Sequence, residues 1–431
     1  MAGLFGTLHS ASTGMSAHQI AIQTTNQNIS NMNNPYYTRQ RVDMIAQRPY
    51  SYPGLTSSNL GAGQLGQGVK VSQITRVRNS FYDYQFRTES PKYGSLQVQN
   101  EYFSGMEAIF NEPSSTSISA SINGLFGTCN ELGKDPNSVS GKNMFVENAK
   151  FLSNNLTVAH NKLNTYSESV NKQIETVISD VNKMLEQLTE LEKEIKIVQA
   201  TGKNPNDLMD MKDQILDELS FKIDINNPDV KNALSDGTLE LAELNNVKMS
   251  GELQGALEVA QKIQEYKDGI EKLMTTIADE FNNVFTTFPG AEDARDLFIV
   301  KKDANGNVTM EVNKDIDENP SSIVMTADKA NAIFELRDKK INFNGTDLTI
   351  NNYYNSIVED LGYKVQMTGK QLENQSALML NIDGARSGVS GVSLDEEMVN
   401  LIQFQHAYSA SAKVISTVDT LLDVVINGLI K

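Results

Sequence analysis

The sequence predicts a mainly α, elongated multi-domain protein with paired N- and C-terminal coiled-coil helices, a long helical-bundle domain and a small β-containing lobe. Three observations lead to this fold class. Apolar residues recur every seven positions at both ends of the 431-residue chain. Between residues 143 and 200 they recur every three or four positions, with no Gly or Pro. Strand-like alternation is confined to short stretches.

The N-terminal segment is helical and uncharged. The first 38 residues contain no Asp, Glu, Lys or Arg. Their heptad spacing predicts a helix to about residue 30, ended by Asn33-Asn34-Pro35. The predicted contact positions are Leu8, Met15, Ile22 and Ile29.

The C-terminal segment has the same character. Ser393 and Glu396 have the spacing of a capping box, with Ser393 as the N-cap of a helix. Residues 398–412 again carry no charged side chain. The predicted contact positions are Leu394, Leu401, Tyr408, Ile415 and Leu422, with Phe404 in the companion line.

Two interpretations of these neutral heptads are open. Each segment could be an ordinary core helix of one globular domain. Alternatively, the two ends pair with each other and then pack against other copies of the chain. Uncharged faces cost little to desolvate and create no repulsion between identical copies. Because both segments are terminal and differ from the acidic middle, the sequence favours the second interpretation.

The middle of the chain is predicted to be a rod of long helices at 143–200, 208–219 and 253–285. Asp303-Ala304-Asn305-Gly306-Asn307 separates two apolar runs and predicts a β-hairpin. The sequence therefore divides as follows: a terminal helical assembly domain, 1–40 plus 385–431; a long helical rod domain, 41–220 plus 251–290 plus 321–384; and two small β-containing insertions, 221–250 and 291–320.

Charge and composition limit the classes of partner that the chain can bind. The chain has a net charge of −17, which argues against nucleic acid or an anionic membrane as a partner. Residues 1–90 carry seven Lys and Arg against three Asp and Glu, so the acidity belongs to the middle. No secretory signal and no membrane-spanning stretch is recognisable. Cys129 is the only cysteine, which excludes an internal disulfide, and we expect it to be a small buried apolar residue.

The sequence offers no candidate catalytic, cofactor-binding or metal-binding residue. The four histidines are dispersed, without the spacing of a zinc site. The loop at 303–307 has Gly at the wrong position for a calcium loop. We therefore expect a protein that is not an enzyme and needs no cofactor.

Two motifs resemble one known family. Residues 8–17 (LHSASTGMSA) and 26–40 (NQNISNMNNPYYTRQ) are similar to the opening helix and asparagine-rich signature of the flagellar rod–hook–junction proteins. Residues 390–397 (SGVSLDEE) and 401–408 (LIQFQHAY) are similar to the C-terminal signature of its junction members. The chain departs from the family at Tyr36, where Gly is usual, so a different local turn is expected there.

The resemblance implies a structural subunit that self-assembles through its terminal helices at the junction between hook and filament. It implies export through the flagellar type III apparatus without a cleaved signal, and an extracellular location. The implied partners are further copies in a ring or helical homo-oligomer, the hook protein, a second junction protein on the filament side and a cytoplasmic export chaperone. A rod or hook subunit remains an alternative, although the long helix at 143–200 argues against it. An acidic coiled-coil enzyme acting on the cell wall is a more remote alternative.

Overall fold

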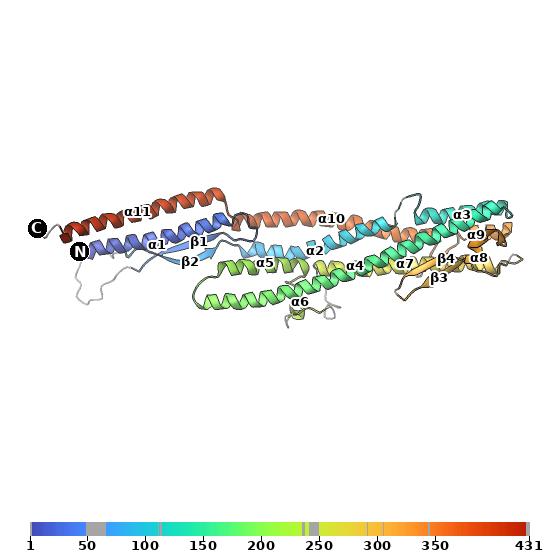
Figure 1. The fold of residues 1–431 in the computed structure, drawn as a ribbon, viewed down its shortest axis with the longest axis horizontal. Helices are drawn as coiled ribbons and strands as arrows, with labels where there is room; N and C mark the ends of the chain where they lie inside the picture. The colour runs from blue at the N-terminus through green and yellow to red at the C-terminus, as the bar shows by residue number, and fades with distance from the viewer. Residues whose placement is uncertain are drawn as a thin grey trace.

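The structure is a computed structural model that describes residues 2–48, 66–110, 112, 114–234, 238–240, 250–290, 292–304, 306–343 and 345–427. These residues form an elongated bundle of long helices, with the N- and C-terminal helices side by side at one end (Figure 1). The mainly α, elongated fold class is thus confirmed. Among the described helices, none combines the length and apolar character needed to cross a membrane.

The helices predicted for the two ends of the chain and for the rod appear in the predicted order. The helices of the structure are α1 Ala2–Ser30, α2 Ser80–Phe110, α3 Ile118–Lys134, α4 Val139–Ala200, α5 Asn206–Lys222, α6 Pro228–Ala233, α7 Glu252–Thr287, α8 Lys314–Glu318, α9 Ala327–Glu335, α10 Ile350–Ser390 and α11 Leu394–Asn427. The strands pair as antiparallel hairpins: β1 Gln40–Ala46 with β2 Val69–Arg76, β3 Phe298–Lys302 with β4 Val308–Val312, and β5 Ile341–Phe343 with β6 Thr346–Leu348. The sequence did not predict α3, α8 or the β5–β6 hairpin.

The rod is built around α4 and α7. At 1.5 Å per residue, the 62 residues of α4 extend about 93 Å. Ser138 starts this helix, since its hydroxyl accepts a hydrogen bond from the Gly141 N–H at 3.1 Å. The 3-4 pattern of α7 is buried along its length, and it shares one apolar core with α2, α4 and α10. The predicted helices at 143–200, 208–219 and 253–285 are therefore present as α4, α5 and α7.

Two glycines allow the rod helices to approach closely near the middle of the bundle. A Cβ atom on Gly94 would lie 2.3 Å from the Phe221 carbonyl oxygen, and one on Gly255 would lie 2.5 Å from the Ser95 carbonyl oxygen. Both distances are shorter than a non-bonded contact allows. Any larger residue would therefore force α2 away from α5 or α7.

The far end of the rod carries the β3–β4 hairpin, as predicted for 298–312; Asn305, in its turn, lies outside the described residues. Side chains of α4 bind the backbone of β4. The Met310 N–H donates to Thr157 Oγ1 at 3.0 Å, and the Val308 N–H donates to His160 Nδ1 at 3.3 Å. Cys129, on α3, is 1% exposed, so its predicted burial is confirmed.

The other predicted β-containing insertion, 221–250, differs from the expectation. Its described residues form the short helix α6 and contain no strand, while 235–237 and 241–249 lie outside the description. Pro228 at the first helical position favours a helical turn over a strand there. At the other end of the rod, α10 runs unbroken through residue 385, where the sequence placed a domain boundary.

The β1–β2 ribbon connects the rod to the terminal helices and lies against α1 (Figure 1). Its approach depends on Gly68, which has φ of +91° and whose Cβ would lie 2.2 Å from Thr13 Oγ1. Before the ribbon, Asn34 forms the turn at Tyr36. Its carbonyl accepts from the Tyr37 N–H and its side chain accepts from the Tyr36 N–H, each at 3.1 Å.

Candidate functional site

Helices α1 and α11 form an antiparallel pair. Gly14 faces Ser411, the rings of His18 and Phe404 stack with centroids 6.3 Å apart, and Asn28 contacts Glu397. Residue numbers therefore rise along α1 as they fall along α11. The two ends of the chain are brought together as the heptads predict.

The centre of this contact differs from the predicted one. The most buried side chains are small or polar, and the large heptad residues lie at the edge of the contact, half-buried. The deeply buried set is Ala17, Ala21, Thr24, Thr25, Asn28 and Val418. The half-buried set is Leu8, Met15, Ile22, Ile29, Leu401, Phe404, Tyr408, Ile415 and Leu422, while Leu394 is 43% exposed. The reason is that α1 is covered by both α11 and the β1–β2 ribbon, and only small side chains fit between them.

Helix α11 exposes an unusual amount of apolar surface. Eight of its large apolar side chains are at least 40% exposed: Leu394, Met398, Val399, Ile402, Val414, Leu421, Val424 and Ile426. By contrast, Val418 is its only buried apolar residue. A helix that exposes more large apolar side chains than it buries has an incomplete set of packing partners.

A polar network fixes the pair to the rest of the chain, with Asn28 at its centre. The Asn28 side chain is 1% exposed. Its amide nitrogen donates to the Gln40 carbonyl at 2.9 Å and to Glu397 Oε2 at 3.0 Å. Its oxygen accepts from the Gln40 N–H at 3.0 Å and from the Tyr37 hydroxyl at 2.8 Å. One side chain thus joins α1, β1 and α11 with every hydrogen-bonding position used.

Arg39 completes this network and corrects the predicted helix cap. Its Nε donates to Glu397 Oε1 at 2.8 Å, and its Nη1 donates to Glu396 Oε2 at 2.9 Å. Helix α11 does begin after Ser393, but the Glu396 carboxylate is directed to Arg39 and makes no hydrogen bond to Ser393. A guanidinium competes successfully because a charge-assisted bond is stronger than a bond to a neutral backbone N–H.

A second polar cluster lies where the ribbon meets α2, α5 and α10. It contains four arginines and four aspartates, with side chains 7–17% exposed: Arg76, Arg78, Arg87, Arg386, Asp83, Asp210, Asp213 and Asp217. Arg76 binds Asp210 and Asp213 at 2.8 and 2.7 Å. Burial alone would raise the pKa of Asp213, but Arg78 and Arg76 hold that pKa below its usual value. Sequence reasoning missed this cluster, because its members come from four separate segments.

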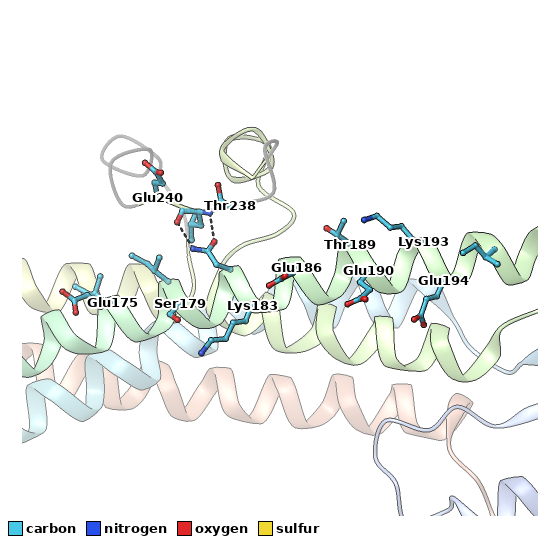
Figure 2. Close-up of a pocket in the computed structure, with 15 residues that line it drawn as sticks. Glu175, Ser179, Lys183, Glu186, Thr189, Glu190, Lys193, Glu194, Thr238 and Glu240 are labelled. Atoms are coloured by element: carbon cyan, nitrogen blue, oxygen red, sulfur yellow. Dashed lines mark hydrogen bonds between the residues drawn. The ribbon is translucent and has the colours of Figure 1, made fainter.

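A groove of about 1340 Å³ runs along α4 beside residues 238–240 (Figure 2). The Asn182 side chain holds this segment, accepting from the Leu239 N–H at 2.7 Å and donating to its carbonyl at 3.2 Å. The charged side chains of the groove are spread along the helix and do not converge on one point (Figure 2). Within the described part of the chain, no group of three or more His, Cys, Asp or Glu has the arrangement of a metal site.

Comparisons with known proteins agree with this architecture. Residues 103–242, which run from α2 past α6, match a family model described as the flagellar hook-associated protein FlgK helical domain. Residues 387–428, which include α11, match a model described as the flagellar basal body rod FlgEFG protein C-terminal region.

Similar full-length proteins are named flagellar hook-associated protein 1. That of Bacillus subtilis is 28% identical over 505 aligned positions, covering 100% of this chain and 99% of the relative. That of Salmonella typhimurium is 22% identical, covering 97% and 99%. The fold resembles the solved flagellar hook junction protein FlgK from Burkholderia pseudomallei, with a TM-score of 0.55 and 12% identity over 71% of this chain and all of that one.

Proposed function

The chain belongs to the flagellar hook-associated protein 1 family, and from this premise we propose that it forms the hook–filament junction by packing its terminal helix pair against the pairs of neighbouring copies. The protein is a structural component of the flagellum. The observation that carries the proposed mechanism is the apolar surface of α11, which the single chain leaves uncovered.

The physical argument starts from the small core of the terminal pair. Ala17, Ala21 and Val418 are the buried apolar residues of the described parts of α1 and α11. This is a small core for helices of 29 and 34 residues, and the large heptad residues beside it are only half-buried, so the single chain leaves the pair weakly stabilised. Packing against other copies would cover the eight exposed side chains of α11 and supply the missing stabilisation. The uncharged faces of residues 1–38 and 398–412 make such packing possible without repulsion.

The proposal extends to organisation and partners. Residues 1–40 with 385–431 form the assembly domain, and the remaining helices form a rod that projects from it. The partners are the hook protein on one side, a second junction protein on the filament side and an export chaperone in the cytoplasm. The assembled protein is extracellular and has a structural, not a catalytic, role. The resemblance of the sequence motifs to junction proteins supports these assignments.

Deletion of the gene, followed by electron microscopy, tests the proposal. A junction protein is required before filament subunits can add, so the deletion strain should carry hooks without filaments and shed flagellin into the medium. Restoring the intact gene should restore filaments. Normal filaments in the deletion strain would refute the proposal, and absence of hooks would indicate a rod or hook subunit instead.

A further inference from the structure

A second uncovered apolar line lies on α4, at the end of the rod far from the terminal helices. Met144, Phe151 and Val158 are seven residues apart and are 56%, 40% and 41% exposed. Heptad spacing keeps three residues on one side of a helix. No described element of the chain covers this side of α4, and the line is too far from α11 to belong to the contact proposed above (Figure 1).

Two long stretches beside this line are uncharged, although Glu147 lies on the same side of α4 between Met144 and Phe151, and Lys162 lies one turn beyond Val158. Helix α3 packs beside it, and Asn155 of α4 donates to Ser121 Oγ at 2.8 Å and to the Thr116 carbonyl at 3.1 Å. Residues 114–130 and 151–161 contain no Asp, Glu, Lys or Arg. We call the surface formed by the exposed residues of these two stretches, together with Met144, the distal neutral face.

Charges at the border of this face are largely compensated. Lys150 lies 2.9 Å from Asp317 and 3.3 Å from Glu147. The nearby His160 is 1% exposed, and burial together with Lys267 lowers its pKa, so it adds no charge near neutral pH. On α3, a Cβ on Gly127 would meet no atom within 4 Å, so a neighbouring chain could approach the backbone there.

Electrostatics identify the partner that such a face fits. The chain as a whole carries −17, so two copies repel each other over most of their surfaces. The repulsion is weakest where both approach through uncharged surface. The distal neutral face combines this property with exposed large apolar residues, as α11 does, although the two lie at opposite ends of the molecule.

We propose that the distal neutral face is a second contact between copies, which binds the rod of a neighbouring subunit in the assembly. This inference rests on the proposed function, because it requires that the chain forms a homopolymer. Two contacts separated by most of the length of the rod fix its tilt, whereas one contact at the terminal pair leaves the rod free to swing.

A photocrosslinking experiment tests this contact in the full-length protein. Phe151 is replaced by benzoylphenylalanine, an aromatic residue suited to an exposed aromatic position, and Gly127 is replaced by it in a second variant. The control position is Ile197, which is 67% exposed on the same helix but lies among charged residues. Each variant is expressed in the deletion strain, and irradiated monomers and isolated hook–junction assemblies are compared.

We expect crosslinks between copies from Phe151 and Gly127 in assemblies, none in monomers and none from Ile197. Loss of incorporation at Phe151 or Gly127, with a normally folded monomer and normal incorporation of the Ile197 variant, would support the same contact. Normal incorporation without crosslinks between copies, or with crosslinks to a different protein, would overturn it. Failure of the proposed function itself is distinguishable, since the unmodified chain would then also be absent from hooks.

Discussion

Substitution of Ile402 by Asp tests the proposed assembly surface of α11 directly. Ile402 is 49% exposed and belongs to the uncovered apolar set of α11, so the change leaves the core of the single chain intact. The predicted contact residues Leu401 and Ile415 are half-buried in the chain itself. Asp at either of these should also block incorporation, but it would disturb the pair within the monomer as well.

The expected magnitude follows from the exposed fraction. Fully burying an isoleucine contributes about 2–3 kcal/mol, so covering the exposed half of Ile402 contributes about 1 kcal/mol per copy. An unpaired carboxylate in the same place adds a desolvation cost of several kcal/mol. Together they weaken the addition of each copy by about 4 kcal/mol, or roughly a thousandfold. Ile402→Ala removes only the apolar part and should weaken addition by roughly fivefold.

Incorporation is measured as the amount of protein retained on purified hooks, and export as the amount shed into the medium. Ile402→Asp should be exported, absent from hooks and unable to restore filaments, while the purified monomer keeps its melting temperature. Ile197→Asp is the matched control, because Ile197 is more exposed but lies among Lys193, Glu194 and Lys196. Retention of Ile402→Asp on hooks at the unmodified level would refute the reasoning.

Three further predictions concern the monomer. Asn28→Ala removes four buried hydrogen bonds and should destabilise the terminal pair by about 3 kcal/mol. Amide hydrogen exchange should therefore accelerate in α1 and α11 and stay unchanged in α4. Equal acceleration in all three helices would contradict this. Gly68→Ala places a Cβ atom on a residue with positive φ, 2.2 Å from Thr13 Oγ1, and should lower the free energy of unfolding by about 2 kcal/mol in thermal melts. Gly66→Ala is the control, because a Cβ atom there meets no neighbour and should have little effect. His160 has its pKa lowered in the folded protein, mainly by burial, so the unfolded chain takes up the proton first as pH falls. Stability should therefore be retained above about pH 6.5 and decline below it, and His160→Gln should reduce this decline in melts across pH; identical pH slopes would count against the assignment.

Much of the helical architecture could be predicted because it depends on local periodicity. The pattern at 143–200, within α4, has no Gly or Pro, and its spacing alone indicates which side is buried. The pairing of the chain ends was also predictable, since two uncharged heptad segments have few other suitable partners. In contrast, α3 was missed although its apolar residues follow the same 3-4 spacing, because its three glycines lower its helix propensity.

The polar anchors could not be predicted, because their members are distant in the sequence. Asn28 and Glu397 are separated by 369 positions, and Arg76 and Asp210 by 134. Periodicity records which side of a helix is apolar but not which polar residues meet across helices. One signal was present: Asn is unfavourable inside a helix, so an Asn next to a heptad position indicates a specific hydrogen-bonding role. The centre of the α1–α11 contact was misplaced for a similar reason, since the pattern gave weight to large residues and the contact selects small ones.

The use of polar anchors in place of an apolar core has a consequence for assembly. A buried hydrogen-bond network tolerates little change in register, whereas apolar contacts tolerate sliding. With Asn28 and Glu397 fixing the register of α1 and α11, the apolar surface of α11 can remain uncovered and still be presented in one orientation. The cluster around Arg76 and Asp210 holds the ribbon against α5 in the same manner, and so sets the angle between the terminal pair and the rod. An assembly with contacts at both ends of the rod requires that angle to be the same in every copy. In the proposed assembly, the anchors therefore contribute mainly to the uniform geometry of the subunit, and the neighbours that this geometry allows to pack would supply the stability of the terminal helices.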